Sequence, residues 1–229
     1  MQDLRGFLLS YIKYGDHDAI LNFFTAENGY QTFFIKGIYS QKNKKKAYLL
    51  PLNELQLTFN SNTKSGNLSQ ISKLELVENR DVNTDVRSNA LIFFVADFLD
   101  QILKLENKNV AIFVAIQDLI KEIEQKNFQA HLVFLYILIE ILGFEPLNST
   151  SKFLNPETGS FENEISHPYF NEEISDLFKI FSNSQDKYLI KIKGSLKKEF
   201  LESLLIYYKY HLSDFREPRS LDILKQIFD

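Results

Sequence analysis

The spacing of apolar residues changes once along the chain, near residue 80, and this change limits the folds that the chain can adopt. Before it, apolar residues fall in short segments bounded by turn residues, a pattern typical of β-strands. After it, they follow the three- and four-residue spacing of amphipathic helices. The sequence therefore predicts an α+β chain, with a β domain over residues 1–80 and a mostly helical domain over residues 81–229.

The first domain carries five segments with the strand pattern. Tyr14-Gly15-Asp16 and Glu27-Asn28-Gly29 supply tight turns between them, because glycine adopts positive φ without steric cost. Five short strands with such connections predict a small closed Greek-key barrel of the OB-fold type, which binds oligonucleotides on one face. The expected strands are residues 6–13, 19–25, 30–36, 52–60 and 71–79, with a polar loop over residues 60–67.

The second domain carries six segments with helical spacing. The third of them is expected to end at Gly143, a favoured left-handed cap, with Pro146 just beyond it. Residues 148–170 have no clear period and predict an irregular insert or a short ribbon. The expected helices are residues 88–106, 109–124, 128–142, 171–181, 196–212 and 220–228, the last with Ser220 as its N-cap.

Composition excludes several classes of protein. The chain has no cysteine, which rules out disulfides, thiolate nucleophiles and cysteine-based metal sites. Its longest apolar run, residues 132–142, is too short to span a bilayer and predicts a buried helix. The N-terminal residues show no signal peptide. We therefore expect a cytoplasmic, nucleoid-associated protein that does not contact membranes.

Charge is distributed unevenly between the two predicted domains. Residues 1–80 contain ten Lys and Arg against seven Asp and Glu, a balance of +3. The remaining 149 residues contain 16 against 23, a balance of −7. A basic N-terminal domain joined to an acidic C-terminal domain indicates that the N-terminal domain makes any contact with a polyanion.

The strongest local signal is a run of five lysines among the eleven residues 36–46, which begins at the end of the third expected strand. On a barrel, such a loop of mobile positive charge can neutralise phosphates with little sequence preference. A solvated surface loop without function is the alternative. The expected DNA contacts are Lys36, Lys42, Lys44, Lys45 and Lys46, with Arg5, Lys13 and a base-stacking Tyr39 as weaker candidates.

Other polar clusters favour structural roles. Asp16-His17-Asp18 could hold a metal or act as an acid–base pair, but it lies in an expected turn, where Asp caps its own backbone. His131, His211 and the acidic residues near His167 lack the spacing of metal ligands. No nucleotide-binding or hydrolase motif is present, so we expect no catalysis, cofactor or metal. Arg216, Arg219 and Lys225 could bind the carboxylate end of a partner peptide.

The order of several short motifs resembles the bacterial recombination mediator family RecO. In the barrel these are Lys13-Tyr14-Gly15-Asp16, Phe24-Thr25, Gly29, Lys36-Gly37 and Leu50-Pro51-Leu52. In the helical region they are Asp97-Phe98-Leu99, His131-Leu132, Leu142-Gly143-Phe144-Glu145-Pro146, Tyr207-Tyr208, His211 and Ser220-Leu221. The resemblance covers essentially the whole chain.

The resemblance implies a DNA repair protein that anneals strands and loads the recombinase RecA onto gapped DNA without nucleotide hydrolysis. Its implied partners are single- and double-stranded DNA, RecR, the acidic tail of single-stranded DNA-binding protein and, indirectly, RecA. That acidic tail requires a basic pocket on the helical domain. Candidates for the pocket are Lys104, Lys108, Lys121 and Lys126.

The sequence departs from the family pattern at two places. Many members carry two Cys-x-x-Cys pairs in a zinc ribbon, whereas residues 149–167 contain no cysteine here. We therefore expect a metal-free segment held by packing of Phe153, Thr158-Gly159 and Phe161. At Tyr39, many relatives carry a basic residue. Two alternatives stay open: a protein-interaction module without a direct DNA function, and a metal-dependent nuclease that uses Asp16, His17 and Asp18.

Overall fold

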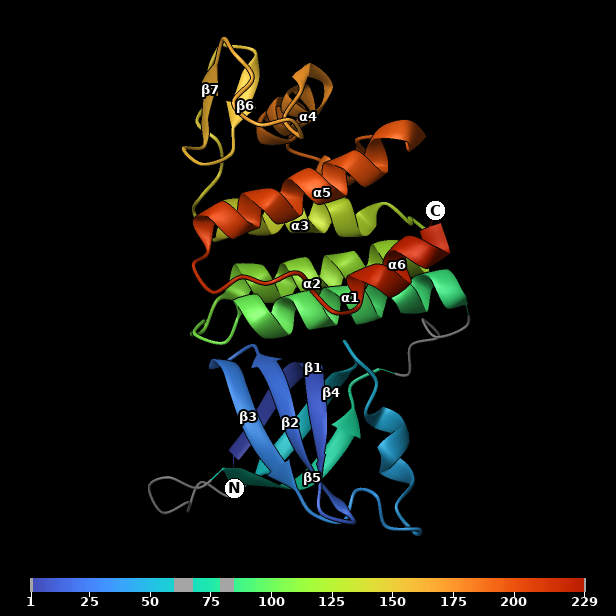
Figure 1. Ribbon diagram of the computed structural model, residues 1–229. Helices are drawn as coiled ribbons and strands as arrows, with labels where there is room; N and C mark the ends of the chain where they lie inside the picture. Colours follow the sequence, from blue (N-terminus) through green and yellow to red (C-terminus); the bar gives the residue numbers. More distant parts are fainter. Residues whose placement is uncertain (1, 60–67, 79–84, 229) are drawn as a thin grey trace. The chain divides into compact units, whose positions relative to one another are not determined.

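The computed structural model describes residues 2–59, 68–78 and 85–228 (Figure 1). It divides into two compact units, the first made of Met1–Phe113 with Pro218–Asp229 and the second of Val114–Glu217. The predicted boundary at residues 80–81 and the predicted loop over residues 60–67 lie outside the described residues. The domain division therefore stays a prediction.

The first unit contains a closed barrel, labelled β1 to β5 in Figure 1, together with two helices. The strand order is β1-β2-β3-β5-β4, and β4 pairs back to β1. Among the strands of the described residues, only β3 and β5 pair in parallel. This confirms the predicted five-stranded OB-fold barrel. The elements of this unit are β1 (Gln2–Tyr14), β2 (Asp18–Thr25), β3 (Gly29–Ile35), η1 (Lys44–Tyr48), β4 (Glu54–Phe59), β5 (Ser69–Leu76), α1 (Val86–Ile102) and α6 (Leu221–Phe228).

The barrel interior is filled by large apolar side chains, because alternate residues of each strand point inward. Phe33 packs between two other rings, with centroid distances of 6.0 Å to Phe23 and 5.2 Å to Phe59. Leucines from the other strands complete the buried cluster: Leu4, Leu8, Leu21, Leu55, Leu57 and Leu74. The Phe-rich composition is therefore used to fill a narrow barrel.

The turn between β2 and β3 packs against the segment that follows α1. The backbone N–H of Tyr30 donates to the carbonyl of Glu106 at 3.0 Å, and the Tyr30 hydroxyl donates to the Asp100 carboxylate at 2.8 Å. Burial and the bond to Asp100 raise the pKa of Tyr30, so the hydroxyl stays protonated and can donate. Gly29 has φ 72°, and a Cβ there would lie 2.2 Å from the carbonyl oxygen of Asn107. Only glycine fits this junction.

The C-terminal helix α6 belongs to the same unit as the barrel and lies against α1. Ser220, directly before α6, donates to the Asp97 carboxylate of α1 through its backbone N–H at 3.0 Å and its hydroxyl at 2.9 Å. The side chain predicted to cap α6 therefore bonds to a residue of α1 that lies 123 positions earlier in the sequence.

The second unit contains most of α2 (Val110–Glu124), three further helices, a 3-10 turn and a two-stranded ribbon. α3 is buried along nearly its whole length, as its apolar run predicts. Its polar groups find partners inside the unit: the Tyr136 hydroxyl donates to the Phe178 carbonyl at 3.2 Å, and the Tyr208 hydroxyl donates to the Leu135 carbonyl at 2.7 Å. The other elements are α3 (Ala130–Ile141), β6 (Phe153–Asn155), β7 (Ser160–Glu162), α4 (Glu172–Asn183), η3 (Lys187–Leu189) and α5 (Gly194–His211).

Every strand and helix expected from the periodicity is present, with ends displaced by a few residues. Gly143 ends α3 with φ 82°, and Gly29 adopts the predicted positive φ. Within the described residues, none of the helices has the length and apolar character that crossing a membrane requires. The predicted irregular insert contains the β6–β7 ribbon.

The glycine junction between the barrel and the segment after α1 gives a direct test of the fold. We expect Gly29→Ala to lower the free energy of unfolding by on the order of 3 kcal/mol, because its Cβ would collide with backbone as well as adopt positive φ. Urea unfolding followed by circular dichroism measures the change.

Gly15 is the matched control, since its φ is 59° and nothing lies within 4 Å of an added Cβ. Gly15→Ala should lower the free energy of unfolding only by the cost of positive φ for alanine, about 1 kcal/mol. Equal losses in the two variants would contradict a steric role for Gly29.

Candidate nucleic-acid interface

The lysine-rich run lies in the connection between β3 and β4, residues 36–53, which we call the lysine connection. Ile38 and Leu49 on this connection are buried in the barrel core and anchor it. Between them lies η1, where the Asn43 side chain accepts from the backbone N–H of Lys45 at 2.9 Å. The sequence predicted an irregular loop of mobile charge, whereas the structure places the lysines on an anchored connection with a helical turn.

The start of the lysine connection is hydrogen-bonded to the turn between β1 and β2. The backbone N–H of Gly37, at φ 68°, donates to the Asp18 carboxylate at 2.7 Å. The backbone N–H of Tyr39 donates to the carbonyl of His17 at 2.9 Å, and the Asn43 side chain donates back to the carbonyl of Gly37 at 3.1 Å. The predicted turn role of Asp16-His17-Asp18 therefore extends to positioning the lysines.

The lysine side chains of this connection face solvent. Lys36, Lys42, Lys44 and Lys46 are exposed, and Lys45 is half-buried. Among the described residues, none of these ammonium groups forms an ion pair. Their charge is thus not neutralised within that part of the chain, and each can contact a phosphate.

Lys13 and Tyr39 are brought together beside the lysine connection. The Lys13 ammonium lies 5.9 Å from the centre of the Tyr39 ring, within the range of a cation–π contact. Tyr39 packs against the barrel core, and burial raises the pKa of its hydroxyl. Two residues selected separately from the sequence therefore lie at one end of the barrel.

Arg5 lies in a different environment from the lysines. Its guanidinium pairs with the carboxylate of Glu54, whose side chain is 1% exposed while that of Arg5 is 41% exposed. The hydrogen bond that the Arg5 guanidinium donates to Glu54 raises the pKa of Arg5. Much of the Arg5 charge therefore compensates a buried carboxylate, so that less of it is available to attract a phosphate.

Sequence reasoning missed two aromatic residues near the end of β1. Tyr11 is 42% exposed and Tyr14 is 59% exposed, and the Tyr14 ring meets the Phe34 ring edge-on with centroids 5.9 Å apart. Period-two alternation along β1 shows that two faces exist. It does not show that side chains on both faces of β1 are exposed to solvent at this end of the barrel.

The basic residues predicted to bind protein partners are distributed over both compact units. Lys104, Lys108 and Arg219 are exposed in the first unit. Lys121 pairs with Asp118 at 2.9 Å in the second unit, where Lys126 is also exposed. A shared basic pocket therefore stays a prediction.

Arg216 lines a pocket of about 340 Å³ within the second unit. The pocket combines an apolar floor with two cations and one carboxylate at its edge. This combination suits a chain end that has an apolar side chain beside a carboxylate. The lining residues are Leu205, Ile206, Lys209, Phe215, Arg216 and Glu217.

The candidate metal ligands have other roles. Within the described ranges, no group of three His, Asp or Glu side chains could hold a metal ion. Glu162 accepts from the Asn155 side chain at 2.9 Å. Burial lowers the pKa of His131 to about 3, which keeps the ring neutral. His211 stacks on Phe144 with centroids 5.4 Å apart.

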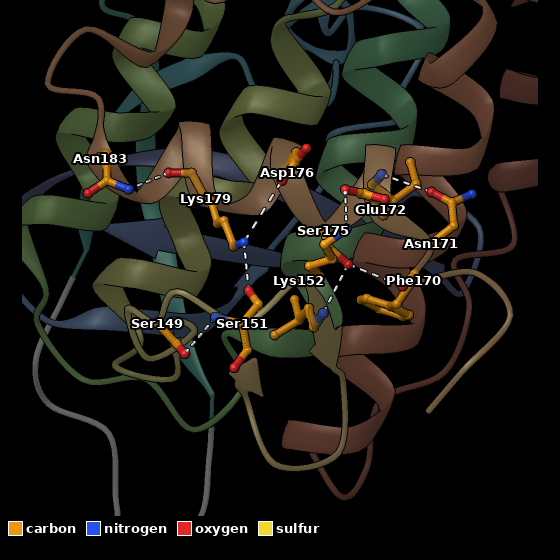
Figure 2. A network of polar contacts seen from close by, with 12 residues as sticks. Ser149, Ser151, Lys152, Phe170, Asn171, Glu172, Ser175, Asp176, Lys179 and Asn183 are labelled. Carbon is orange, nitrogen blue, oxygen red and sulfur yellow. Dashed lines mark hydrogen bonds and ion pairs between the residues drawn. The ribbon is translucent and has the colours of Figure 1, made fainter. Parts of the chain in front are cut away.

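The β6–β7 ribbon is fixed to α4 by a network of polar contacts (Figure 2). The Ser175 hydroxyl accepts from the backbone N–H of Leu154 at 2.9 Å and donates to the carbonyl of Phe170 at 3.1 Å. The Lys179 ammonium donates to the carbonyl of Ser151 at 2.7 Å and lies 3.9 Å from Asp176. Hydrogen bonds from α4 therefore hold this cysteine-free segment in place.

Packing contributes to the same attachment. Phe161 is buried with the Lys179 ammonium 4.8 Å from its ring centre, as expected for a packing residue, and Phe153 is half-buried. Leu154, which the sequence did not single out, is completely buried. A Cβ on Gly159 would lie 2.9 Å from the Tyr207 hydroxyl, so the ribbon approaches α5 closely at this point.

The fold and the interface together define a class: an OB-fold barrel with a basic strand connection, joined to a helical region that carries a short ribbon without cysteines. Comparison with known proteins agrees. The family model for "Recombination protein O N terminal" matches residues 1–80. The chain is 29% identical over 234 residues to "DNA repair protein RecO" of Christiangramia forsetii, with 98% of each chain covered.

Other relatives match over the same extent. The proteins of the same name from Flavobacterium psychrophilum and Bacteroides fragilis are 28% and 26% identical, with 98% and 100% of each chain covered. The chain is similar to RecO proteins over essentially its whole length, and it contains no cysteine. This confirms the resemblance found in the sequence.

The ribbon network predicts that Ser175→Ala destabilises the second unit. The substitution leaves the buried N–H of Leu154 and the carbonyl of Phe170 without this partner, and we expect a loss of about 1–3 kcal/mol. Urea unfolding measures the loss, and faster amide hydrogen exchange at Leu154 locates it.

Ser195→Ala is the matched control, because Ser195 is exposed near the start of α5. It should leave both readouts unchanged. A chelator should also leave the unfolding midpoint of the native chain unchanged. Stability equal to native in Ser175→Ala, or a chelator-dependent midpoint, would contradict attachment of the ribbon by hydrogen bonds.

Proposed function

We propose that this chain is a recombination mediator in DNA repair that binds DNA through its barrel and the lysine connection. The helical part of the chain recruits RecR and the acidic tail of single-stranded DNA-binding protein. The outcome is annealing of complementary strands and loading of RecA onto gapped DNA. The similarity of the chain to RecO proteins over its whole length supports this proposal.

The observation that carries the proposal is the exposed charge of the lysine connection. Four exposed lysines and one half-buried lysine lie on a connection that is anchored in the barrel core and hydrogen-bonded to the β1–β2 turn. Phosphate binding by such a group releases counterions, which gives affinity that depends steeply on salt and weakly on sequence. A mediator that acts on any gapped DNA needs this kind of binding.

The proposed activity consists of association and handover, without a catalytic step. The barrel holds one strand while partners are exchanged, and a complementary strand pairs with it. The competing candidate is a protein-interaction module without a direct DNA function. It predicts weak DNA binding that does not respond to charge changes in the lysine connection.

The lysine connection can be tested with Ala at Lys42, Lys44, Lys45 and Lys46. Because each lysine that contacts a phosphate contributes about one unit to the slope of log affinity against log salt, we expect the variant to bind more weakly and with a slope shallower by up to about four units. Fluorescence anisotropy with labelled single-stranded and duplex DNA across a salt series measures both quantities.

The control carries Arg at the same four positions, which keeps the charge while changing the side chains. It should keep most of the native slope. If the Ala and native proteins share one slope, the phosphate contacts lie elsewhere on the chain. If DNA binding is weak and identical in all three proteins, the interaction-module candidate is favoured.

The pocket at Arg216 supports the recruitment of an acidic peptide tail. Lys209 and Arg216 can bind carboxylates, while Leu205 and Phe215 offer apolar surface. We expect Arg216→Glu to weaken binding of a labelled peptide from the tail of single-stranded DNA-binding protein by about tenfold or more. Lys197→Glu, an exposed lysine near the start of α5, makes the same charge change outside the pocket. Equal loss in both variants would refute binding in the pocket.

A further inference from the structure

The lysine connection consists entirely of basic and neutral residues, yet it is bonded to a carboxylate from another part of the barrel. Residues 36–53 contain five lysines and no Asp or Glu. Asp18, the first residue of β2, accepts from the backbone N–H of Gly37 at 2.7 Å. A carboxylate beside these lysines lowers their attraction for phosphate. Its place in the structure therefore points to the hydrogen bond that it makes.

Both main-chain polar groups of Gly37 are used. Its N–H donates to Asp18, as described above. Its carbonyl accepts from the side-chain amide of Asn43 and from the backbone N–H of Ser40, each at 3.1 Å. Gly37 is therefore bonded on one side to the β1–β2 turn and on the other side to the interior of the lysine connection.

Asn43 links Gly37 to the helical turn η1. Its amide nitrogen donates to the carbonyl of Gly37, and its side-chain oxygen accepts from the backbone N–H of Lys45 at 2.9 Å as the N-cap of η1. Three hydrogen bonds in series therefore connect the Asp18 carboxylate to a turn whose first three residues are lysines.

The first bond of this series is the strongest. A carboxylate that accepts an amide N–H makes a charge-assisted hydrogen bond, about twice as strong as one between neutral groups. Asp18 is half-buried, and its bond to Gly37 is the shortest of the three. Hydrogen bonds in a linked series polarise one another, so loss of the first weakens the others.

The lysine connection has other attachments that do not depend on the Asp18 side chain. The bond from Tyr39 to His17 uses backbone atoms only, and Ile38 and Leu49 lie in the barrel core. Removal of the Asp18 carboxylate therefore leaves the connection attached to the barrel. What it removes is the restraint on the lysine-bearing turn between these attachments.

We propose that Asp18 is a positioning residue for DNA binding. Through Gly37 and Asn43, its carboxylate orders the lysine-bearing turn before DNA arrives, so that several lysines contact phosphates together. A turn that is ordered only on binding loses affinity by the cost of that ordering. The gain from ordering outweighs the repulsion between the carboxylate and phosphate. This inference rests on the proposed DNA-binding function and adds to it a residue of negative charge.

The test compares two substitutions that remove the same charge. Asp18→Ala also removes the acceptor, whereas Asp18→Asn keeps a side-chain oxygen that can accept from Gly37. We expect Asp18→Ala to lower DNA affinity by about fivefold or more and to make the salt slope shallower by about one unit. Asp18→Asn should keep the native slope and bind at least as tightly as the native chain. Fluorescence anisotropy with labelled DNA across a salt series measures both quantities, and circular dichroism checks that each variant is folded.

Two further variants separate charge from position. Asp16→Ala removes a charge from an exposed side chain of the same turn, so it should bind slightly more tightly with the native slope. Asn43→Ala changes no charge but removes the next two bonds of the series, so it should lower affinity and slope as Asp18→Ala does. The double variant should lose little more than the more affected single variant, because both residues act through one series of bonds.

Amide hydrogen exchange measures the positioning without DNA. Exchange at Gly37 and Lys45 should be faster in Asp18→Ala than in the native chain and close to native in Asp18→Asn. Native exchange rates at both amides in Asp18→Ala would contradict the proposal whatever the DNA affinity is.

The possible outcomes separate the two proposals. If Asp18→Ala binds DNA as tightly as the native chain or more tightly, with the native slope, positioning by Asp18 is overturned and DNA binding by the lysine connection stands. Equal losses in Asp18→Ala and Asp18→Asn also overturn it, because the acceptor then makes no difference. If the native chain binds no DNA at low salt, the proposed function fails and this inference fails with it.

Discussion

The order of strands in the barrel creates the constraint on which the candidate interface depends. Consecutive strands β3 and β4 are not neighbours, because β5 lies between them. The chain must therefore leave β3 and travel a long way before it can pair as β4. The connection is stabilised by placing Ile38 and Leu49 in the core, which leaves the intervening lysines facing solvent. The strand order requires a long connection between β3 and β4, and the sequence places solvent-exposed lysines on it.

Charge has two distinct uses in the barrel, and the structure separates them. Arg5 pairs with a buried carboxylate, whose charge would be costly without a partner. The lysines of the connection have no ion-pair partner among the described residues, so they add little to folding and can be used for binding. Composition alone cannot make this distinction, because the partner of Arg5 lies 49 residues away.

The parts of the structure that were predictable are those set by local periodicity. Strands and helices were placed to within a few residues because a buried face repeats every two residues in a strand and every 3.6 in a helix. Features set by contacts between distant residues were not predictable. Ser220, directly before α6, bonds to Asp97 of α1. α6 therefore belongs to the unit that contains the barrel and α1, and not to the unit that contains α3, α4 and α5. The position of the exposed side chains of Ile12 and Tyr14 beside Ile20 and Phe34 depends in the same way on the register of three strands.

The ribbon shows how a two-stranded segment without the cysteines of a zinc site can be held in place. A zinc ion fixes its ligands to one another, so a zinc ribbon can be stable with few contacts to its surroundings. Here the ribbon strands have three residues each and are held by Ser175 and Lys179 of α4. Because these contacts belong to the helical unit, the ribbon can be ordered only where that unit is folded. The stability of the ribbon therefore depends on the helix that holds it.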